Sequence, residues 1–180
     1  MAKKPRLTLV HPCVGRHRNE PYLRSWQMEP LAPALLSALT PNTWDKSFYD
    51  DRLELIDYDH PTDLVAISVE TYTARRAYQI ASEFRKRGVP VVMGGFHPTL
   101  VPEEAGEFAE AVVVGEAETV WEKLLADFEN GRLEKYYRSA SGRDRAQLQA
   151  VRPDRSLFKG KRYLPIRLVE AGRGCHFSCR

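Results

Sequence analysis

The chain has 180 residues, of which 43% are hydrophobic and 28% are charged, and its formal net charge is +3 at pH 7. This composition excludes a disordered or collagen-like chain, and the small charge, spread along the sequence, argues against a nucleic-acid-binding surface. The sequence shows neither a membrane-spanning apolar run nor a signal peptide, so we expect a cytoplasmic protein with no membrane partner.

Short apolar runs predict the strands of a sheet. They are rich in β-branched residues and too brief for helices, and they carry few polar positions, which is typical of parallel strands covered on both faces. A weaker strand is expected around residues 46–49. The stronger runs are residues 6–10, 64–69, 90–93 and 111–114.

Segments with helical spacing alternate with these runs. Residues 30–39 begin with prolines, which the first turn of a helix tolerates, and residues 73–87 and 117–130 each place apolar side chains on one face. Gly88 and Gly131 follow the last two segments at the position of a C-terminal cap. Because crossovers between parallel strands are right-handed, the order predicts an α/β fold with a doubly wound parallel sheet of flavodoxin-like, Rossmann-like topology.

The character of the sequence changes after the last of these helices. Residues 139–160 begin with a stretch rich in Ser, Gly, Arg, Gln and Asp, which predicts an exposed linker. We therefore expect the α/β domain to occupy residues 5–138. Residues 163–170 are strand-like again, so residues 161–180 are expected to form the first strand and following loop of another domain.

Four loops are expected to form a ligand site, because ligands of open parallel sheets bind beyond the carboxyl ends of the strands, where the strand order reverses. The Gly94-Gly95 pair is the most informative part, since glycine lets a ligand lie against the backbone. The pair is equally compatible with a simple strand-to-helix turn. The candidate residues are His11, Pro12, Cys13 and Val14; Ser68, Val69 and Glu70; Gly94, Gly95, Phe96 and His97; Gly115 and Glu116.

Other ligand classes fit these loops less well. A dinucleotide-binding G-x-G-x-x-G would follow the first strand, where only Gly15 is present, and the same lack of a phosphate-binding loop disfavours an independent flavin or nucleotide binder. A phosphoryl-receiver domain would need acidic residues where Val10 and Ser68 stand. The acidic residues Asp50 and Asp51 are interpreted as a solvated strand end.

With these motifs in view, the stretch from about residue 6 to residue 138 resembles the vitamin B12 (cobalamin)-binding domain that precedes the catalytic barrel in B12-dependent radical S-adenosylmethionine (SAM) proteins. The strongest matches are residues 93–99, which read MGGFHPT, and residues 114–118, which read VGEAE. Cys175 and Cys179 also fall where that architecture has the loop of its iron–sulfur cluster. The resemblance implies cobalamin as the ligand of this chain.

The resemblance assigns roles to several loop residues. Gly94 and Gly95 match the glycine pair beside the nucleotide tail of cobalamin. Ser68 matches the serine of the family's S-x-L element, but Glu70 stands where leucine is usual. His97 either donates a hydrogen bond to cobalamin or caps the helix that follows.

The family's cobalt-ligand signature, D-x-H-x-x-G, is absent. If His11 is taken as the histidine, Leu9 replaces the aspartate. Members that lack the signature bind cobalamin with no histidine on cobalt, so Pro12, Cys13 and Val14 become candidates to line the lower face of the corrin.

Cys175 and Cys179 form a C-x-x-x-C run that lacks the third cysteine of C-x-x-x-C-x-x-C. Three thiolates at that spacing resemble the cluster loop of radical SAM enzymes, which holds a [4Fe-4S] cluster. Two thiolates are too few, so the cluster and SAM are expected only in a longer protein that carries the third cysteine. In this chain alone, the two cysteines are also compatible with free thiols.

These features predict the cobalamin-binding portion of a B12-dependent radical SAM enzyme, a methyltransferase in its full-length form, with the radical SAM barrel as its partner in cis. The chain itself is expected to bind and not to catalyse. The alternative is a degenerate fold of the same type, without cofactor, that serves as an interaction or docking domain.

Overall fold

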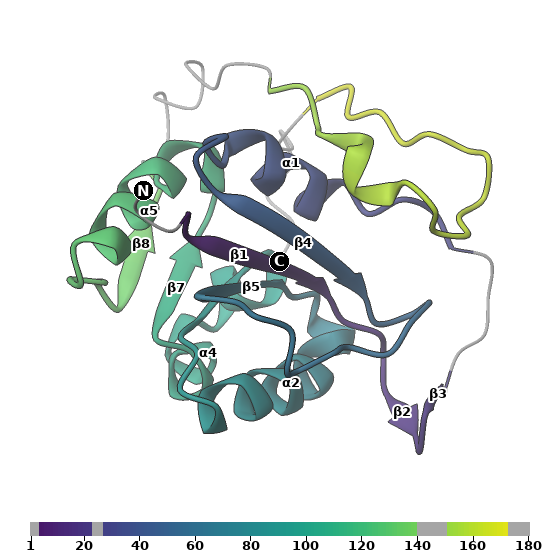
Figure 1. Cartoon of the computed structure of the whole chain (residues 1–180), viewed down its shortest axis with the longest axis horizontal. Helices are drawn as coiled ribbons and strands as arrows, with labels where there is room; N and C mark the ends of the chain where they lie inside the picture. Colours follow the sequence, from purple (N-terminus) through teal and green to yellow (C-terminus); the bar gives the residue numbers. More distant parts are fainter. Residues whose placement is uncertain (1–3, 23–26, 140–150, 173–180) are drawn as a thin grey trace, which may run out of the picture.

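A six-stranded parallel sheet forms the centre of the computed structural model, which describes residues 4–22, 27–139 and 151–172 (Figure 1). The strand order is β4-β1-β5-β6-β7-β8, and it reverses between β1 and β5. This order confirms the predicted doubly wound, flavodoxin-like α/β fold. The strands are β1 (Arg6–His11), β4 (Asp45–Asp50), β5 (Leu64–Ser68), β6 (Val91–Gly94), β7 (Ala111–Val114) and β8 (Tyr136–Arg138).

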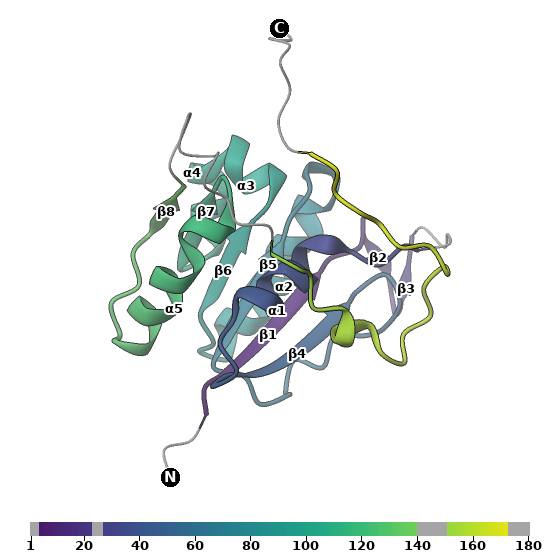
Figure 2. The same ribbon diagram turned by 90° about the horizontal axis from the view of Figure 1, so that it is seen from above.

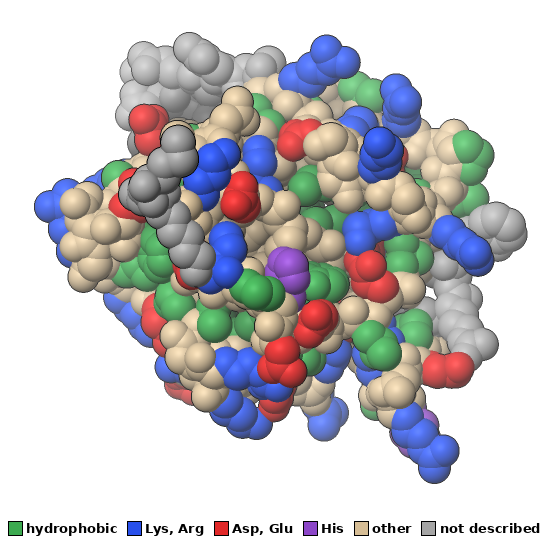
Figure 3. Space-filling model, in the orientation of Figure 1, with side chains coloured by type: hydrophobic (Ala, Val, Ile, Leu, Met, Phe, Trp, Pro, Cys, Tyr) green, Lys and Arg blue, Asp and Glu red, His purple; other side chains and the backbone are tan. Residues whose placement is uncertain are grey.

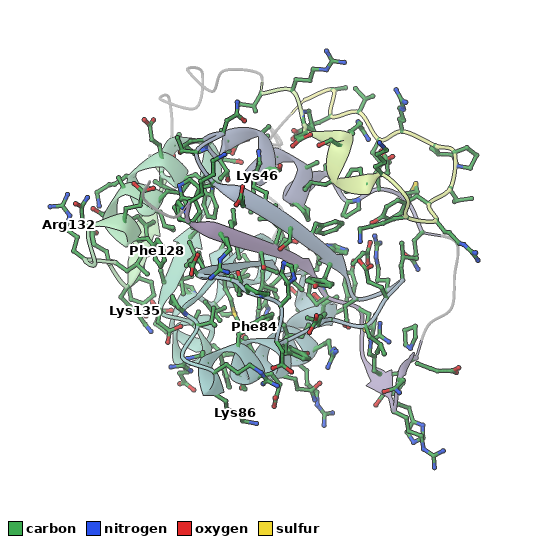
Figure 4. The ribbon with its side chains drawn as sticks, viewed as in Figure 1. Lys46, Phe84, Lys86, Phe128, Arg132 and Lys135 are labelled. Atoms are coloured by element: carbon green, nitrogen blue, oxygen red, sulfur yellow. The ribbon has the colours of Figure 1, made fainter. Side chains whose placement is uncertain are left out.

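Helices cover both faces of the sheet (Figure 2). On one face, α1 (Leu31–Leu39) and α5 (Trp121–Glu129) pack on the sheet, and α2 (Ala74–Lys86) and α4 (Pro102–Phe108) cover the other. Figure 4 places Phe84 of α2 and Phe128 of α5 on these two layers. The remaining elements are α3 (Phe96–Leu100), the short hairpin β2 (Arg16–His17) and β3 (Glu20–Pro21), and the 3-10 helices η1 (Thr71–Thr73), η2 (Ala117–Thr119) and η4 (Arg155–Phe158).

The central strand β5 shows why these runs form a covered sheet. All of its side chains are buried, and they alternate between the two cores. Leu64 and Ala66 join the core under α1 and α5, whereas Val65 and Ile67 join the core under α2. Successive residues of a strand point to opposite faces, so a strand in this position must be apolar throughout.

Most predicted elements lie within one residue of the observed ones, but the helix predicted over residues 117–130 is divided into η2 and α5, which begins at Trp121. The weak strand predicted at residues 46–49 is the edge strand β4. The sequence interpretation anticipated a helix after His97, which is α3, but it did not include α4, the hairpin of β2 and β3, or the second edge strand β8. These three missed elements are short, and their periodicity is correspondingly weak.

Residues 151–172 pack back onto the domain. Phe158 is buried, and its ring lies edge-on to Phe48 of β4 and to Tyr163, with centroid distances of 5.8 and 5.3 Å. The backbone N–H of Asp154 donates to the carbonyl of Ala34 in α1 at 2.9 Å. The segment around Phe158 is therefore anchored to α1 and β4.

The strand predicted over residues 163–170 is also absent from the structure. This segment runs past β4 without pairing with it, and the backbone N–H of Leu164 donates instead to the carbonyl of Gln27 at 2.8 Å. An apolar, β-branched run becomes a strand only where a neighbouring strand offers free backbone groups. The boundaries 5–138, 139–160 and 161–180 remain predictions.

Across the described ranges, the helices lack the combination of length and apolar character that a membrane span requires.

Candidate functional site

The strand order brings the four candidate loops to one edge of the molecule. All six strands are parallel, so the loops that follow β1, β5, β6 and β7 leave neighbouring carboxyl ends. The reversal between β1 and β5 is the place where sheets of this type bind ligands. His11, Ser68 and Gly94 end three consecutive strands there.

His11 and Ser68 join the two strands at this reversal point. The Nδ1 atom of His11 and the Oγ atom of Ser68 lie 3.3 Å apart, at hydrogen-bonding distance. Burial lowers the pKa of His11 to about 4, and the positive charge of Arg52 acts in the same direction against the opposing charges of Asp50 and Asp51. The imidazole is therefore neutral at pH 7, and one of its nitrogens already has a partner within the protein.

The lowered pKa of His11 predicts a pH dependence of stability. The unfolded imidazole titrates near its usual value, about 6.5, so between about pH 6.5 and pH 4 the unfolded state binds more protons than the folded state. The free energy of unfolding should fall by about 3 kcal/mol as the pH falls through this window. Urea denaturation of the wild type and of His11→Gln at pH 7 and pH 4.5 measures this effect.

The same comparison contains its own control, because the remaining histidines are common to both proteins. The wild type should lose more stability between the two pH values than His11→Gln does. Equal losses would show that His11 titrates normally in the folded protein.

Asp50 and Asp51 are completely buried, so their interpretation as a solvated strand end is wrong. Asp51 accepts hydrogen bonds from the Nε atoms of Arg16 and Arg76, both at 2.8 Å, and from the backbone N–H of Cys13 at 3.2 Å. Burial acts to raise the pKa of Asp51, but the hydrogen bonds and charge of Arg76 outweigh it and hold the pKa below its usual value. Asp51 thus ties the loop after β1 to α2.

Asp50 connects the carboxyl end of β4 to the C-terminal segment. Its carboxylate accepts hydrogen bonds from Nε of Arg52 at 2.8 Å and from the hydroxyl of Tyr163 at 2.8 Å. Burial acts to raise the pKa of Asp50, but the hydrogen bonds and charge of Arg52 lower it overall. Asp50 also pairs in register with His11, so this cluster supports the floor of the candidate site.

The loop after β1 presents one side chain to solvent and buries the others. Pro12 and Cys13 are buried, whereas Val14 is 38% exposed. Burial raises the pKa of the Cys13 thiol to about 11, and the Asp51 carboxylate adds to this rise. Cys13 is therefore a neutral thiol at pH 7, in keeping with its interpretation as a small buried apolar residue.

The Gly94-Gly95 pair makes a close approach between β6 and its neighbours. Gly95 has a φ of 108°, and a Cβ atom there would lie 2.9 Å from the carbonyl oxygen of Val69. A Cβ on Gly94 would lie 3.3 Å from the Cβ of Val113. The protein itself thus fills the Cβ positions, while the backbone of Gly95 is exposed and that of Gly94 is partly exposed at the edge.

His97 is turned into the protein and away from solvent. It is buried, and its Nε2 atom lies 2.9 Å from the hydroxyl of Tyr78, which also donates to Glu104 at 2.9 Å. These contacts connect α3 to α2 and α4. The predicted capping role is wrong, because Gly95 is the N-cap of α3 and that end has no side-chain cap hydrogen bond. The hydrogen bond of His97 to cobalamin stays a prediction.

The other candidates organise the turns beyond their strands. Val69 is buried, and the backbone N–H of Glu70 donates a hydrogen bond to the Oγ1 atom of Thr73 at 3.1 Å. Gly115 has a φ of 89°, and its N–H donates to Oγ1 of Thr99 at 3.0 Å. The N–H of Glu116 donates to Oγ of Ser139 at 3.0 Å. These residues therefore shape the loops through backbone contacts.

Large apolar side chains are exposed just beyond three neighbouring strands. Val14 after β1 is 38% exposed, Tyr72 after β5 is 67% exposed and Phe96 after β6 is 60% exposed. Together they form what we term the apolar rim: Val14, Tyr72 and Phe96. Tyr72 was not among the sequence-predicted site residues, although its position four residues beyond the end of a buried strand is a usable signal. Exposed apolar side chains gathered at a ligand-binding edge are typical of a binding surface.

The described part of the chain contains no cluster of three or more His, Cys, Asp or Glu side chains arranged to hold a metal ion. Cys175 and Cys179, the predicted cluster ligands, lie outside the described residues. Their role therefore remains a prediction.

Comparison with known proteins identifies the domain type. Residues 42–125 match the family model of the B12 binding domain, which confirms the predicted B12-binding domain. A solved N-terminal domain of a hypothetical protein from Thermotoga maritima aligns with 48% of this chain and 74% of its own length, at 19% identity and a TM-score of 0.39.

Two curated relatives are methyltransferases of Chlorobaculum tepidum. Bacteriochlorophyllide d C-8(2)-methyltransferase is 38% identical over 160 residues, which cover 83% of this chain and 34% of the relative. Bacteriochlorophyllide d C-12(1)-methyltransferase is 30% identical over 156 residues, with coverage of 83% and 34%. The chain thus spans about a third of the length of the curated relatives that it matches, and it is related to methyltransferases over that part.

Proposed function

We propose that this chain, in which residues 42–125 match the B12-binding domain family, binds cobalamin at the carboxyl edge of its sheet. The observation that carries the proposal is the apolar rim of Val14, Tyr72 and Phe96 at the reversal of strand order. A flat macrocycle with an apolar face gains free energy by covering such side chains, at about 25 cal/mol per Å² of apolar surface removed from water.

The residues at this edge fit a cobalamin site. The backbone at Gly94 and Gly95 is accessible and carries no side chain, so an extended tail can lie close to it. Val14, Tyr72 and Phe96 would cover the lower face of the corrin and keep water from it. The loop after β1 is held in place by Asp51, whose carboxylate accepts a hydrogen bond from the backbone N–H of Cys13.

His11 is proposed to stay off the cobalt. Its imidazole is neutral at pH 7, as a metal ligand must be, but its Nδ1 is at hydrogen-bonding distance from Ser68, within the floor of the site. The cobalt-ligand signature is also missing from the sequence around it. Its role would then be to hold β1 and β5 together beneath the corrin.

In its full-length form, the protein is proposed to be a B12-dependent radical SAM methyltransferase. Bound cobalamin would supply a transferable methyl group. Cys175 and Cys179, with a third cysteine absent from this chain, would hold the [4Fe-4S] cluster in the following domain. The methyltransferase names of the two relatives support the reaction class.

A binding measurement on rim variants tests the site. Phe96→Glu and Tyr72→Glu each place a carboxylate against the proposed apolar face, so each should raise the Kd for hydroxocobalamin at least about tenfold, which corresponds to about 1.4 kcal/mol. Asn42→Glu adds the same charge at an exposed position before β4, at the amino edge of the sheet, and should leave the Kd unchanged. Titrations followed by corrin absorbance give all three values.

The rival function is a cofactor-free docking domain with the same fold. It predicts that the wild type and all three variants fail to bind hydroxocobalamin. Binding that is unaffected by Phe96→Glu and Tyr72→Glu would place the ligand elsewhere on the molecule.

A further inference from the structure

A basic cavity lies on the C-terminal segment. It has a volume of about 420 Å³ and is lined by Arg152, Pro153, Asp154, Arg155 and Arg167. Arg152 and Arg167 are distant in sequence, and the turn of the segment between them brings them to one cavity. Figure 3 shows Lys and Arg side chains gathered over this part of the molecule, at the upper right.

Only part of this positive charge is neutralised within the protein. Arg155 forms an ion pair with Glu29 and donates a hydrogen bond to the carbonyl of Leu168 at 2.6 Å. The carboxylate of Asp154 is engaged by the hydroxyls of Ser37 and Ser156, at 2.7 and 2.6 Å. Asp154 also forms an ion pair with Lys46 at 3.9 Å, and it is the one carboxylate among three arginines in the lining, so the cavity keeps an excess of positive charge.

Arg152 and Arg167 are exposed, and neither takes part in an ion pair with another described residue. Positive side chains that line one cavity repel each other, and an anion in the cavity would offset that repulsion. The planar fork of arginine matches carboxylate and phosphate oxygens. The lining therefore favours an oxyanion over a neutral or cationic ligand.

A second cavity adjoins the first. Its volume is about 340 Å³, and the two linings share Arg167. The Arg155–Glu29 ion pair connects them as well, because Arg155 lines the first and Glu29 the second. Three of its eight lining residues are charged, Glu29, Lys161 and Arg167, and among the other five Ile166 is 51% exposed. The apolar members are Phe158, Tyr163, Leu164, Pro165 and Ile166.

We propose that these two cavities form one binding site for a small anionic molecule, with its carboxylate or phosphate group between Arg152 and Arg167 and its apolar body against Ile166. The site lies on the segment that packs against α1 and β4, away from the apolar rim. Its lining shares no residue with the apolar rim.

Titrations with three probes at constant ionic strength test the site: inorganic phosphate, acetate and 2-naphthoate. The wild type should bind phosphate and 2-naphthoate saturably, and 2-naphthoate at least about tenfold more tightly than acetate, because the arene reaches the apolar cavity. The double variant Arg152→Gln, Arg167→Gln should weaken both at least about tenfold. Tighter binding of phosphate than of either carboxylate would support the proposal and would identify the ligand as a phosphate compound.

The control is Arg75→Gln, which removes one positive charge from an exposed position on α2. It should leave all three affinities unchanged, and circular dichroism melting confirms that each variant is folded. Loss of binding in this control as large as in the double variant would show nonspecific charge attraction and overturn the proposal. Absence of saturable binding by the wild type would also overturn it. The double variant should bind hydroxocobalamin with the same Kd as the wild type. This titration therefore distinguishes a failure of the anion site from a failure of the proposed function.

Discussion

Asp51→Ala is expected to lower the free energy of unfolding by about 3–5 kcal/mol. The Asp51 carboxylate is completely buried between Arg16 and Arg76, whose side chains are 7% and 16% exposed. Removing it leaves two guanidinium groups with no compensating charge in a poorly solvated place. The backbone N–H of Cys13 also loses its acceptor. The effect should be large because several groups depend on one carboxylate.

Urea denaturation at pH 7 measures this cost, and Asp59→Ala is the matched control. Asp59 is paired with Arg87, but its side chain is 86% exposed, so its loss should cost less than about 1 kcal/mol. Similar costs for the two variants would contradict the assignment of Asp51 as the centre of a buried network.

Gly95→Ala should destabilise the fold by at least about 2 kcal/mol more than Gly88→Ala does. Both glycines have a positive φ, 108° at Gly95 and 74° at Gly88, so both substitutions strain the backbone. The two sites differ in the room that they leave for a methyl group. A Cβ atom on Gly95 would lie 2.9 Å from the carbonyl oxygen of Val69 and 3.0 Å from its nitrogen, whereas a Cβ atom on Gly88 would have no atom within 4 Å. Gly95→Ala must therefore move the carboxyl end of β5 as well.

Thermal and urea unfolding of both variants gives the comparison. Gly95→Ala should also weaken hydroxocobalamin binding, since the displaced backbone of Val69 lies at the proposed site, and Gly88→Ala should not. Equal stability of the two variants would mean that the turn after β6 relaxes without cost, and the close approach of β5 and β6 would not need glycine.

The sequence was sufficient to predict the sheet because its strands are short and apolar on both faces. The runs that became β1, β5, β6 and β7 follow directly from burial in a parallel sheet. The position of the candidate loops follows as well, since parallel strands place all their carboxyl ends at one edge.

Pair contacts between distant residues could not be predicted in this way. Asp50 and Asp51 look solvated in the sequence because most of their partners are far away along the chain. Asp50 is bonded to Tyr163 as well as to its neighbour Arg52, and Asp51 is bonded to Arg16 and Arg76. A buried carboxylate is recognised only when its cations are known to lie beside it.

The orientation of individual side chains could not be predicted from the sequence either. The contact of His97 with Tyr78 depends on the packing of α3 against α2, and the exposure of Tyr72 depends on the short turn η1. The strand predicted at residues 163–170 failed for a related reason, because strand pairing depends on a neighbour that local sequence does not specify.

Direct binding of hydroxocobalamin to the wild-type chain is the measurement that tests the central claim. After incubation with excess hydroxocobalamin and desalting, the protein should carry corrin absorbance corresponding to about one cobalamin per chain, a stoichiometry that follows from one binding edge per sheet. A folded protein that elutes without corrin absorbance would contradict the proposed cobalamin site and favour the docking domain.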